Sequence, residues 1–155
     1  MRVIAGNAGP EGRVPLRAKP VSGREPLSWA AVMAAAPFDE LYGIEIETAS
    51  GDEARGRVPV SDAVRQPAGL VHGGVYASMA ESLAVAGTQA STGRAAVGHS
   101  SQTSFLRPIT DGTVHATGRP RHRGRSTWVW EFDVTDDEAR LCALVRMTVS
   151  VRDAV

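Results

Sequence analysis

One acidic residue interrupts an otherwise uncharged stretch of the chain. Between Gly73 and Gly93 the only formal charge is Glu81, and the positions three and four residues away on either side carry no cation. A carboxylate on a buried helix is costly to desolvate unless it is paired, hydrogen-bonded or protonated. Two interpretations are therefore open: Glu81 is a reactive carboxylate, or it has a structural role in which it meets an arginine from a strand or faces solvent.

A glycine-rich segment leads directly into this stretch. Residues 69–74 read Gly-Leu-Val-His-Gly-Gly. A glycine at a helix start lets a ligand oxygen approach free backbone N–H groups, and the helix dipole adds positive potential there. Such a site holds an oxyanion or a polarised carbonyl without a charged side chain. A plain tight turn explains the glycines as well, and His72 taken alone is typical of a local hydrogen-bonding residue.

The third feature is a basic run at residues 119–125, with four arginines and one histidine, which Ser126 and Thr127 follow. Arginine forks and hydroxyl groups both donate hydrogen bonds to phosphate oxygens. A solvated turn between strands accounts for the same run. Contact with nucleic acid is disfavoured, because no aromatic residues are interleaved with the arginines and the 17 basic and 17 acidic residues of the chain cancel.

Positioning these residues requires one long helix. Residues 73 to about 91 are rich in alanine, apolar almost all round and bounded by Gly93, which predicts a buried helix. A shorter helix is predicted at residues 27–36, where apolar residues have near-helical spacing and Pro37 ends the pattern. The glycine-rich segment and the isolated carboxylate would then belong to a single helix.

Alternating apolar and polar residues predict strands on both sides of the long helix. A hairpin is expected around the Gly51-Asp52 turn, and four further strands follow the helix. One buried helix and about six antiparallel strands predict an α+β domain in which the sheet wraps the helix. The expected strands cover residues 44–48, 54–60, 95–106, 113–118, 127–135 and 141–151.

The length of the chain, 155 residues, fits one domain with a real core. Residues 1–25 are rich in glycine and proline and are predicted to form a loose arm, so that the folded domain occupies residues 26–155. The single cysteine, Cys142, excludes an intrachain disulfide and fits a reducing compartment. No apolar stretch reaches membrane-spanning length and no secretory signal is present, which predicts a cytoplasmic protein without membrane contact.

Other chemistries leave no signature in the sequence. The motifs H-E-x-x-H, paired C-x-x-C, G-x-x-x-x-G-K-[ST] and G-x-G-x-x-G are absent, so neither a metal nor a nucleotide cofactor is expected. Residues 98–102 come close to the G-x-S-x-G elbow of serine hydrolases but lack its final glycine and lie in a strand pattern. Cys142 has no neighbouring base, so it is predicted to be a small buried hydrophobe and not a nucleophile.

Taken together, these motifs resemble the hotdog-fold acyl-CoA thioesterases, and most closely the bacterial 4-hydroxybenzoyl-CoA thioesterases of the Arthrobacter type. The matching motifs lie in the same order over residues 40–152. The resemblance implies a hotdog fold, in which an antiparallel sheet of about six strands wraps one long central helix, and a homotetramer built as a dimer of dimers. The segments that carry the resemblance are residues 65–81, 96–108, 126–130 and 140–152.

The same resemblance implies roles for individual residues. Glu81 would act as nucleophile or general base, the Gly73 N–H would polarise the thioester carbonyl, and Gln66 would orient the reacting group. His72 matches the histidine that supports this loop in the family. The positions that match contacts to the pantetheine and phosphates of coenzyme A are Arg107, Ser126, Thr127 and Arg152, to which Arg125 of the basic run is added.

The chain departs from the family pattern at two places. The resembled enzymes have a threonine one helical turn after the glutamate, where it helps to place water, but this chain has Val85. Another group, such as Thr88, is then needed for the hydrolytic step. After the glutamine the resembled enzymes have an arginine and a tryptophan, where this chain has Pro67 and Ala68. The acyl pocket is therefore expected to differ from theirs.

These features predict an enzyme that hydrolyses an aromatic acyl-CoA thioester, hydroxybenzoyl- or phenylacetyl-like, or a short acyl-CoA thioester, to the free acid and coenzyme A without a cofactor. Gly73 and Glu81 would lie about 12 Å apart along a helix axis. Because both groups must reach one carbonyl, active sites shared between protomers are expected. The alternative is a non-catalytic acyl-CoA-binding hotdog domain that acts as a ligand sensor, although a mere binding pocket has little use for an unpaired carboxylate.

Overall fold

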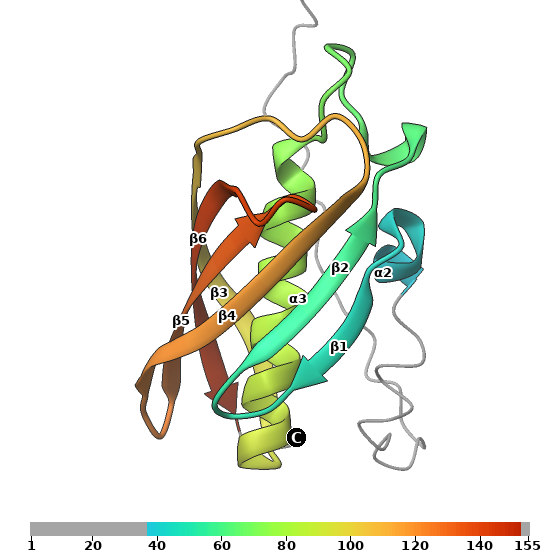
Figure 1. Cartoon of the computed structure of the whole chain (residues 1–155). Helices are drawn as coiled ribbons and strands as arrows, with labels where there is room; N and C mark the ends of the chain where they lie inside the picture. Colours follow the sequence, from blue (N-terminus) through green and yellow to red (C-terminus); the bar gives the residue numbers. More distant parts are fainter. Residues whose placement is uncertain (1–36, 153–155) are drawn as a thin grey trace, which may run out of the picture. The chain divides into compact units, whose positions relative to one another are not determined.

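A long helix, α3 (Gly73–Thr92), packs against one face of a six-stranded antiparallel sheet (Figure 1). This computed structural model describes residues 37–152, all within one compact unit. The predicted arm at residues 1–25 and the predicted helix at residues 27–36 lie outside the described residues. The strands are β1 (Glu45–Ala49), β2 (Ala54–Pro59), β3 (Ala95–Phe105), β4 (Thr113–Arg123), β5 (Thr127–Thr135) and β6 (Leu141–Arg152), and the short helices are α2 (Pro37–Tyr42) and η1 (Asp62–Val64).

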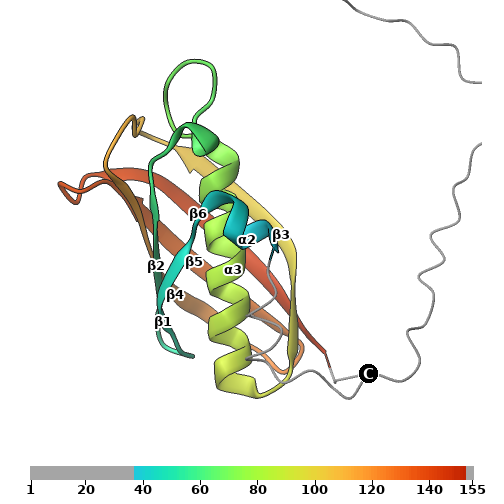
Figure 2. The same ribbon diagram turned by 90° about the vertical axis from the view of Figure 1, so that its right-hand side faces the viewer.

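The sheet has the strand order β1-β2-β4-β5-β6-β3, and all neighbouring pairs are antiparallel. β1 and β3 are the edge strands, so the chain leaves α3 to form one edge before it returns to the middle of the sheet. Figure 2 shows that the strands curve around α3 and that α2 lies over part of the side that the sheet does not cover. The predicted α+β architecture, with about six antiparallel strands on one long helix, is confirmed.

Local signals define both ends of α3. His72 is its N-cap residue, and Gly93 ends the helix at φ +63° with its N–H bonded to Gln89 O. Glycine adopts this left-handed conformation without steric cost, which explains the stop after Thr92. The predicted helix from residue 73 to about residue 91 is confirmed. No helix within residues 37–152, α3 included, is long and apolar enough to cross a membrane.

The hydrophobic core lies between α3 and the sheet. Trp130 and Phe132 of β5 are fully buried in the same cluster as Met79 and Leu83 of α3. The Trp130 and Phe132 rings stack with their centroids 6.0 Å apart. Burial of each side chain of this size stabilises the fold by roughly 1.5–3 kcal/mol. These contacts fix the middle of α3 on the sheet.

Strand β4 is longer than the alternation predicts. The pattern ends at residue 118, but the strand continues to Arg123. In this extension Arg119 is the ladder partner of Glu131, and Arg121 Nε donates to Glu131 Oε2 at 2.5 Å. The register also shifts between Pro120 and His122. Cross-strand charge pairs stabilise this part of the strand, and for that reason it lacks the apolar alternation from which a strand is predicted.

The start of the described chain also differs from expectation. The sequence pattern assigns no helix after Pro37, but residues 37–42 form α2. Proline is well tolerated at the first helical position, since its missing N–H has no partner there in any case. The Tyr42 hydroxyl donates to Asp39 Oδ1 at 2.8 Å and lies 3.2 Å from Ser82 Oγ, which links α2 to α3.

Candidate active site

The loop before α3 is closed by its own backbone. The Gln66 N–H donates to Leu70 O at 2.8 Å, and the Gly69 N–H donates to Gln66 O at 2.8 Å. Gly69 has φ +84°, so the tight-turn interpretation of the glycines holds at this position. Gly73 and Gly74 have no positive φ. The turn does not require them; the Phe105 ring and the His72 side chain lie instead where side chains at Gly73 and Gly74 would start.

His72 caps α3 and leaves the backbone N–H of Gly73 without an acceptor among residues 37–152. Its Nδ1 accepts a hydrogen bond from the Gly74 N–H at 3.0 Å. The Gly73 N–H has no acceptor among residues 37–152, as is usual for the first N–H of a helix. The helix dipole adds partial positive charge at this end. A free N–H in this position can polarise a carbonyl or hold an oxyanion.

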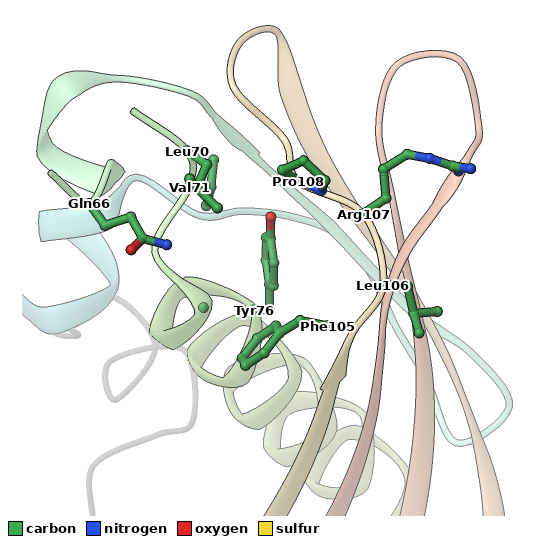
Figure 3. Close-up of a pocket in the computed structure, with 9 residues that line it drawn as sticks. Gln66, Leu70, Val71, Tyr76, Phe105, Leu106, Arg107 and Pro108 are labelled. Carbon is green, nitrogen blue, oxygen red and sulfur yellow. The ribbon is translucent and has the colours of Figure 1, made fainter. Parts of the chain in front are cut away.

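Gly73 borders a cavity of about 320 Å³. Figure 3 shows the Gln66 side chain projecting from its loop and the rings of Tyr76 and Phe105 lying next to each other. The two ring centroids are 6.1 Å apart and the ring planes are tilted by 49°. The rest of the wall is mostly apolar and comes from Leu70, Val71, Leu106 and Pro108, with Arg107 at the rim.

Tyr76 contributes a neutral ring to this cavity. Burial raises the pKa of its phenol to about 12, although the Ile109 backbone opposes this shift. The hydroxyl is therefore protonated near neutral pH.

Glu81 lies outside this cavity, two helical turns further along α3. Its side chain is exposed and lies against Gly98 of β3. None of the ion pairs recorded within residues 37–152 includes Glu81. In the single chain the interpretation in which Glu81 faces solvent holds, because the sheet does not cover the side of α3 that carries it. The interpretation in which Glu81 meets a strand arginine is not observed in the described part of the chain.

Arg107, one of the residues predicted to contact coenzyme A, lies at the cavity rim in the loop after β3. Its N–H and that of Leu106 both donate to Cys142 O, at 3.0 and 2.9 Å. The guanidinium is directed away from Gln66 (Figure 3), and its Nη1 lies 3.4 Å from Leu141 O. Arg107 is therefore near Gln66 and Gly73, but its charge faces outward.

The other predicted coenzyme A residues lie at the opposite end of α3. Arg152 is the ladder partner of Ala95, which follows shortly after the last residue of the helix. Thr127 pairs with Ser150, and Ser126 O accepts a hydrogen bond from the Val151 N–H at 2.9 Å. Because α3 has 20 residues, its two ends are about 30 Å apart. One chain therefore does not bring Ser126, Thr127 and Arg152 together with Gly73.

The basic run is mostly engaged in ion pairs on the sheet surface. Arg123 Nη2 donates to Asp52 Oδ1 at 2.6 Å, and its guanidinium lies 5.6 Å from the centroid of the Trp128 ring. Arg119 and Arg121 pair with Glu53 and Glu131. Arg125 is exposed, and its guanidinium has no ion pair among the residues the structure describes. Of the four arginines, Arg125 is the one available to a ligand.

Thr88 does not fit the role expected of it. It is fully buried, and its Oγ1 accepts a hydrogen bond from Trp130 Nε1 at 3.0 Å. A hydroxyl in this position cannot place a water molecule beside the exposed Glu81. The prediction that Thr88 replaces the threonine missing at position 85 is wrong, because Thr88 faces the core.

The structure also bears on the predictions for Cys142 and for metal binding. The Cys142 thiol is buried and donates to Arg140 O at 3.2 Å, and burial raises the pKa of the thiol. The prediction of a small buried residue is confirmed. Within residues 37–152 no group of histidine, cysteine, aspartate and glutamate side chains is placed to hold a metal ion.

Three residues near the site were not singled out from the sequence. Tyr76 lies one helical turn after Gly73, and an aromatic residue at that spacing from a candidate oxyanion donor is a usable signal. Phe105 and Gly98 lie on β3. Their proximity to Gly73 and Glu81 depends on how β3 packs beside α3, which no local pattern reveals.

Comparison with known proteins places this site in a family. A profile of the thioesterase superfamily matches residues 68–143, which include Gly73 and Glu81. A relative named "Putative esterase Rv1847", from Mycobacterium tuberculosis, is 37% identical over 123 residues, which cover 76% of this chain and 88% of that protein. The solved structure of thioesterase HI1161 from Haemophilus influenzae has a TM-score of 0.73 at 28% identity and covers 83% of this chain and 93% of its own. The PaaI protein of E. coli, from the phenylacetic acid degradation operon, has a TM-score of 0.74 at 25% identity over 81% of this chain and 91% of its own.

The chain belongs to the thioesterase superfamily and has the hotdog fold. It is an enzyme of the thioester hydrolase class, as the matched family and relatives indicate. The finer resemblance to the Arthrobacter-type 4-hydroxybenzoyl-CoA thioesterases is not supported by these matches. The acyl group, the oligomer and the roles of single residues stay predictions.

Proposed function

We propose that the protein hydrolyses an acyl-CoA thioester to the free acid and coenzyme A. The observation that carries this proposal is the free Gly73 N–H at the edge of a largely apolar cavity. The acyl group would occupy the cavity, and the N–H would donate a hydrogen bond to the carbonyl oxygen and stabilise the oxyanion that develops on it. The Gln66 amide lines the same cavity and would orient the reacting group.

Glu81 supplies the carboxylate of the reaction. It is exposed and is free of recorded ion pairs within residues 37–152, so its oxygens are available to a substrate. In one route the carboxylate attacks the carbonyl carbon, the C–S bond breaks, and water then hydrolyses the acyl anhydride. In the other route the carboxylate takes a proton from the water that attacks the carbonyl. Both routes need Glu81 within roughly 3–3.5 Å of its reaction partner.

A complete site requires a second protomer. Gly73 and Glu81 are separated by about 12 Å along α3, and Glu81 does not line the cavity that Gly73 borders. Beside Glu81, β3 is an edge strand that pairs only with β6 in the described chain. We infer that each active site takes Gly73 and Gln66 from one protomer and Glu81 from its partner, within a dimer of dimers.

The same reasoning applies to the coenzyme A moiety. Arg125, Ser126, Thr127 and Arg152 lie about one helix length from Gly73, so they would bind phosphates of a substrate whose carbonyl is held by another protomer. Arg107 at the cavity rim would contact the pantetheine arm. Hydroxyl and guanidinium groups donate hydrogen bonds to phosphate oxygens, which favours the role of these residues in binding coenzyme A.

An aromatic acyl group fits the cavity best. The rings of Tyr76 and Phe105 form part of its wall, and an aromatic acyl group could make offset or edge-to-face contacts with them. The similarity to the PaaI protein, from an operon for phenylacetic acid degradation, points in the same direction.

The decisive experiment is thiol release from a panel of benzoyl-, hydroxybenzoyl-, phenylacetyl- and hexanoyl-CoA by wild type and Glu81→Gln. Wild type should release thiol from at least one aromatic ester. Glu81→Gln should keep the fold and bind the ester but lose at least roughly a hundredfold in kcat, because it removes the nucleophile or base. Glu40→Gln, at an exposed glutamate of α2, is the control and should be unchanged. Near wild-type kcat for folded Glu81→Gln would exclude this mechanism.

A further inference from the structure

Gly98 of β3 lies directly beside the Glu81 side chain. A Cβ built on Gly98 would be 2.2 Å from Glu81 Oε1, 2.8 Å from Cδ and 3.1 Å from Cγ. Real Cβ atoms do not approach other heavy atoms this closely. Any residue other than glycine at position 98 must therefore displace the Glu81 carboxylate.

The backbone does not require glycine at this position. The described glycines with positive φ are at positions 43, 69, 93 and 112, and Gly98 is not one of them. Glycine within a strand weakens it, because it has no side chain to pack and loses more conformational freedom. The close approach of Glu81 is thus the feature that explains a glycine here.

The strand is also irregular at this point. The pairing of β3 with β6 shifts register between Gly98 and Ser100, which leaves His99 without a partner in the ladder. Such bulges bend a strand and re-aim its side chains, and they are common next to active sites. Together the glycine and the bulge form a notch in the edge strand, which we call the Gly98 notch.

We propose that Gly98 is a positioning residue that fixes the carboxylate of Glu81 for catalysis. This inference rests on the proposed function, in which Glu81 is the reacting group. An exposed glutamate otherwise samples several rotamers, and holding it in one costs side-chain entropy. The Gly98 notch provides the space in which the carboxylate lies against β3, and a side chain at position 98 would force Glu81 into another rotamer. The observed rotamer places the carboxylate on the side of α3 that the sheet does not cover, where the partner's substrate must arrive.

Gly98→Ala tests this role because the added methyl group should move Glu81 without unfolding the protein. The displaced atoms are the exposed end of a flexible side chain. A shift of about 1 Å in a reacting group can lower the rate by roughly a hundredfold. We expect kcat to fall at least tenfold while KM changes little, and Ser100→Ala in the same bulge to leave both unchanged.

A double-mutant cycle separates positioning from general damage. Glu81→Asp shortens the side chain by one methylene and should lower kcat by itself. In Gly98→Ala/Glu81→Asp the shorter side chain leaves room for the methyl group, so kcat should be no lower than in Glu81→Asp alone. Independent effects would multiply instead. Multiplied losses, or wild-type kcat in folded Gly98→Ala, would overturn the inference.

Two outcomes keep this test distinct from that of the proposed function. If Glu81→Gln retains turnover, the proposed function fails, whatever Gly98→Ala does. If Glu81→Gln is inactive and Gly98→Ala is not impaired, only the positioning role fails. Should Gly98→Ala not fold, Gly98→Ala/Glu81→Ala is compared with Glu81→Ala: a folded double variant supports the contact, and an unfolded one shows that the methyl group meets something other than Glu81.

Discussion

The phenyl ring of Phe105 lies against Gly73, the first residue of α3. A Cβ built on Gly73 would be 2.4 Å from Phe105 Cζ and 2.6 Å from Cε1. The ring is 62% exposed, and Tyr76 is its aromatic neighbour. In the proposed mechanism a thioester carbonyl bound at the Gly73 N–H must therefore lie next to this ring, which makes Phe105 a wall of the proposed acyl site.

Phe105→Ala should change which acyl groups are accepted. Aromatic contacts contribute about 0.5–1.5 kcal/mol beyond area burial, so kcat/KM for benzoyl-CoA should fall roughly two- to tenfold relative to that for hexanoyl-CoA. Phe38 is also 62% exposed and does not line the cavity, which makes Phe38→Ala the matched control. Competition between the two esters measures the ratio directly. An unchanged ratio in Phe105→Ala would mean that the ring does not contact the acyl group.

The shared site predicts complementation between inactive variants. Gln66→Ala is the better partner for Glu81→Ala, since a side chain at Gly73 would also displace Phe105. Each variant alone should be nearly inactive. After co-refolding in equal amounts, half of the dimers are mixed and each has one intact site, so about a quarter of wild-type activity should return. If native mass spectrometry shows mixed dimers and activity stays absent, Glu81 acts within its own chain.

Arg125 and Arg123 should differ in their effect on substrate binding. Arg125 has no recorded ion pair within residues 37–152, whereas Arg123 is paired with Asp52 at 2.6 Å. Arg125→Ala should raise KM for CoA esters about three- to tenfold with little change in kcat, since a phosphate contact acts on ground-state binding. Arg123→Ala removes the same charge and should raise KM less. The corresponding pantetheine thioesters, which lack the nucleotide, should show no effect of Arg125→Ala; an effect of equal size would place Arg125 away from the phosphates.

Thr88→Val should affect stability and not catalysis. The substitution leaves the buried Trp130 Nε1–H without an acceptor, which costs about 1–3 kcal/mol of unfolding free energy. Urea denaturation measures the loss, and Thr148→Val, at a half-buried threonine without a recorded side-chain hydrogen bond, is the control. Wild-type kcat is expected at a temperature where Thr88→Val is folded. A large fall in kcat with an unchanged free energy of unfolding would indicate that Thr88 takes part in the hydrolytic step.

The fold could be predicted from the sequence because its signals are local. The helical spacing of apolar residues and the glycine at position 93 predict the bounds of α3. The alternation of apolar and polar residues predicts the ends of most strands to within a few residues. The predicted end of β4 is wrong because charge pairs such as Arg121 with Glu131 replace apolar alternation there. The site was predictable only where residues are close in sequence. Contacts such as Gly98 with Glu81 join separate elements and follow from packing alone.

Within residues 37–152 one edge of β3 pairs with no other strand, which affects how the chain reaches its native state. An edge strand presents free backbone N–H and C=O groups, which form a template for any other strand. β3 runs over 11 residues and also exposes Val97, so a newly folded chain should be vulnerable to aggregation until the partner protomer that we propose covers this edge. Recovery from denaturant should therefore show an optimum in protein concentration: dilute chains find no partner, and concentrated ones add strands in the wrong register.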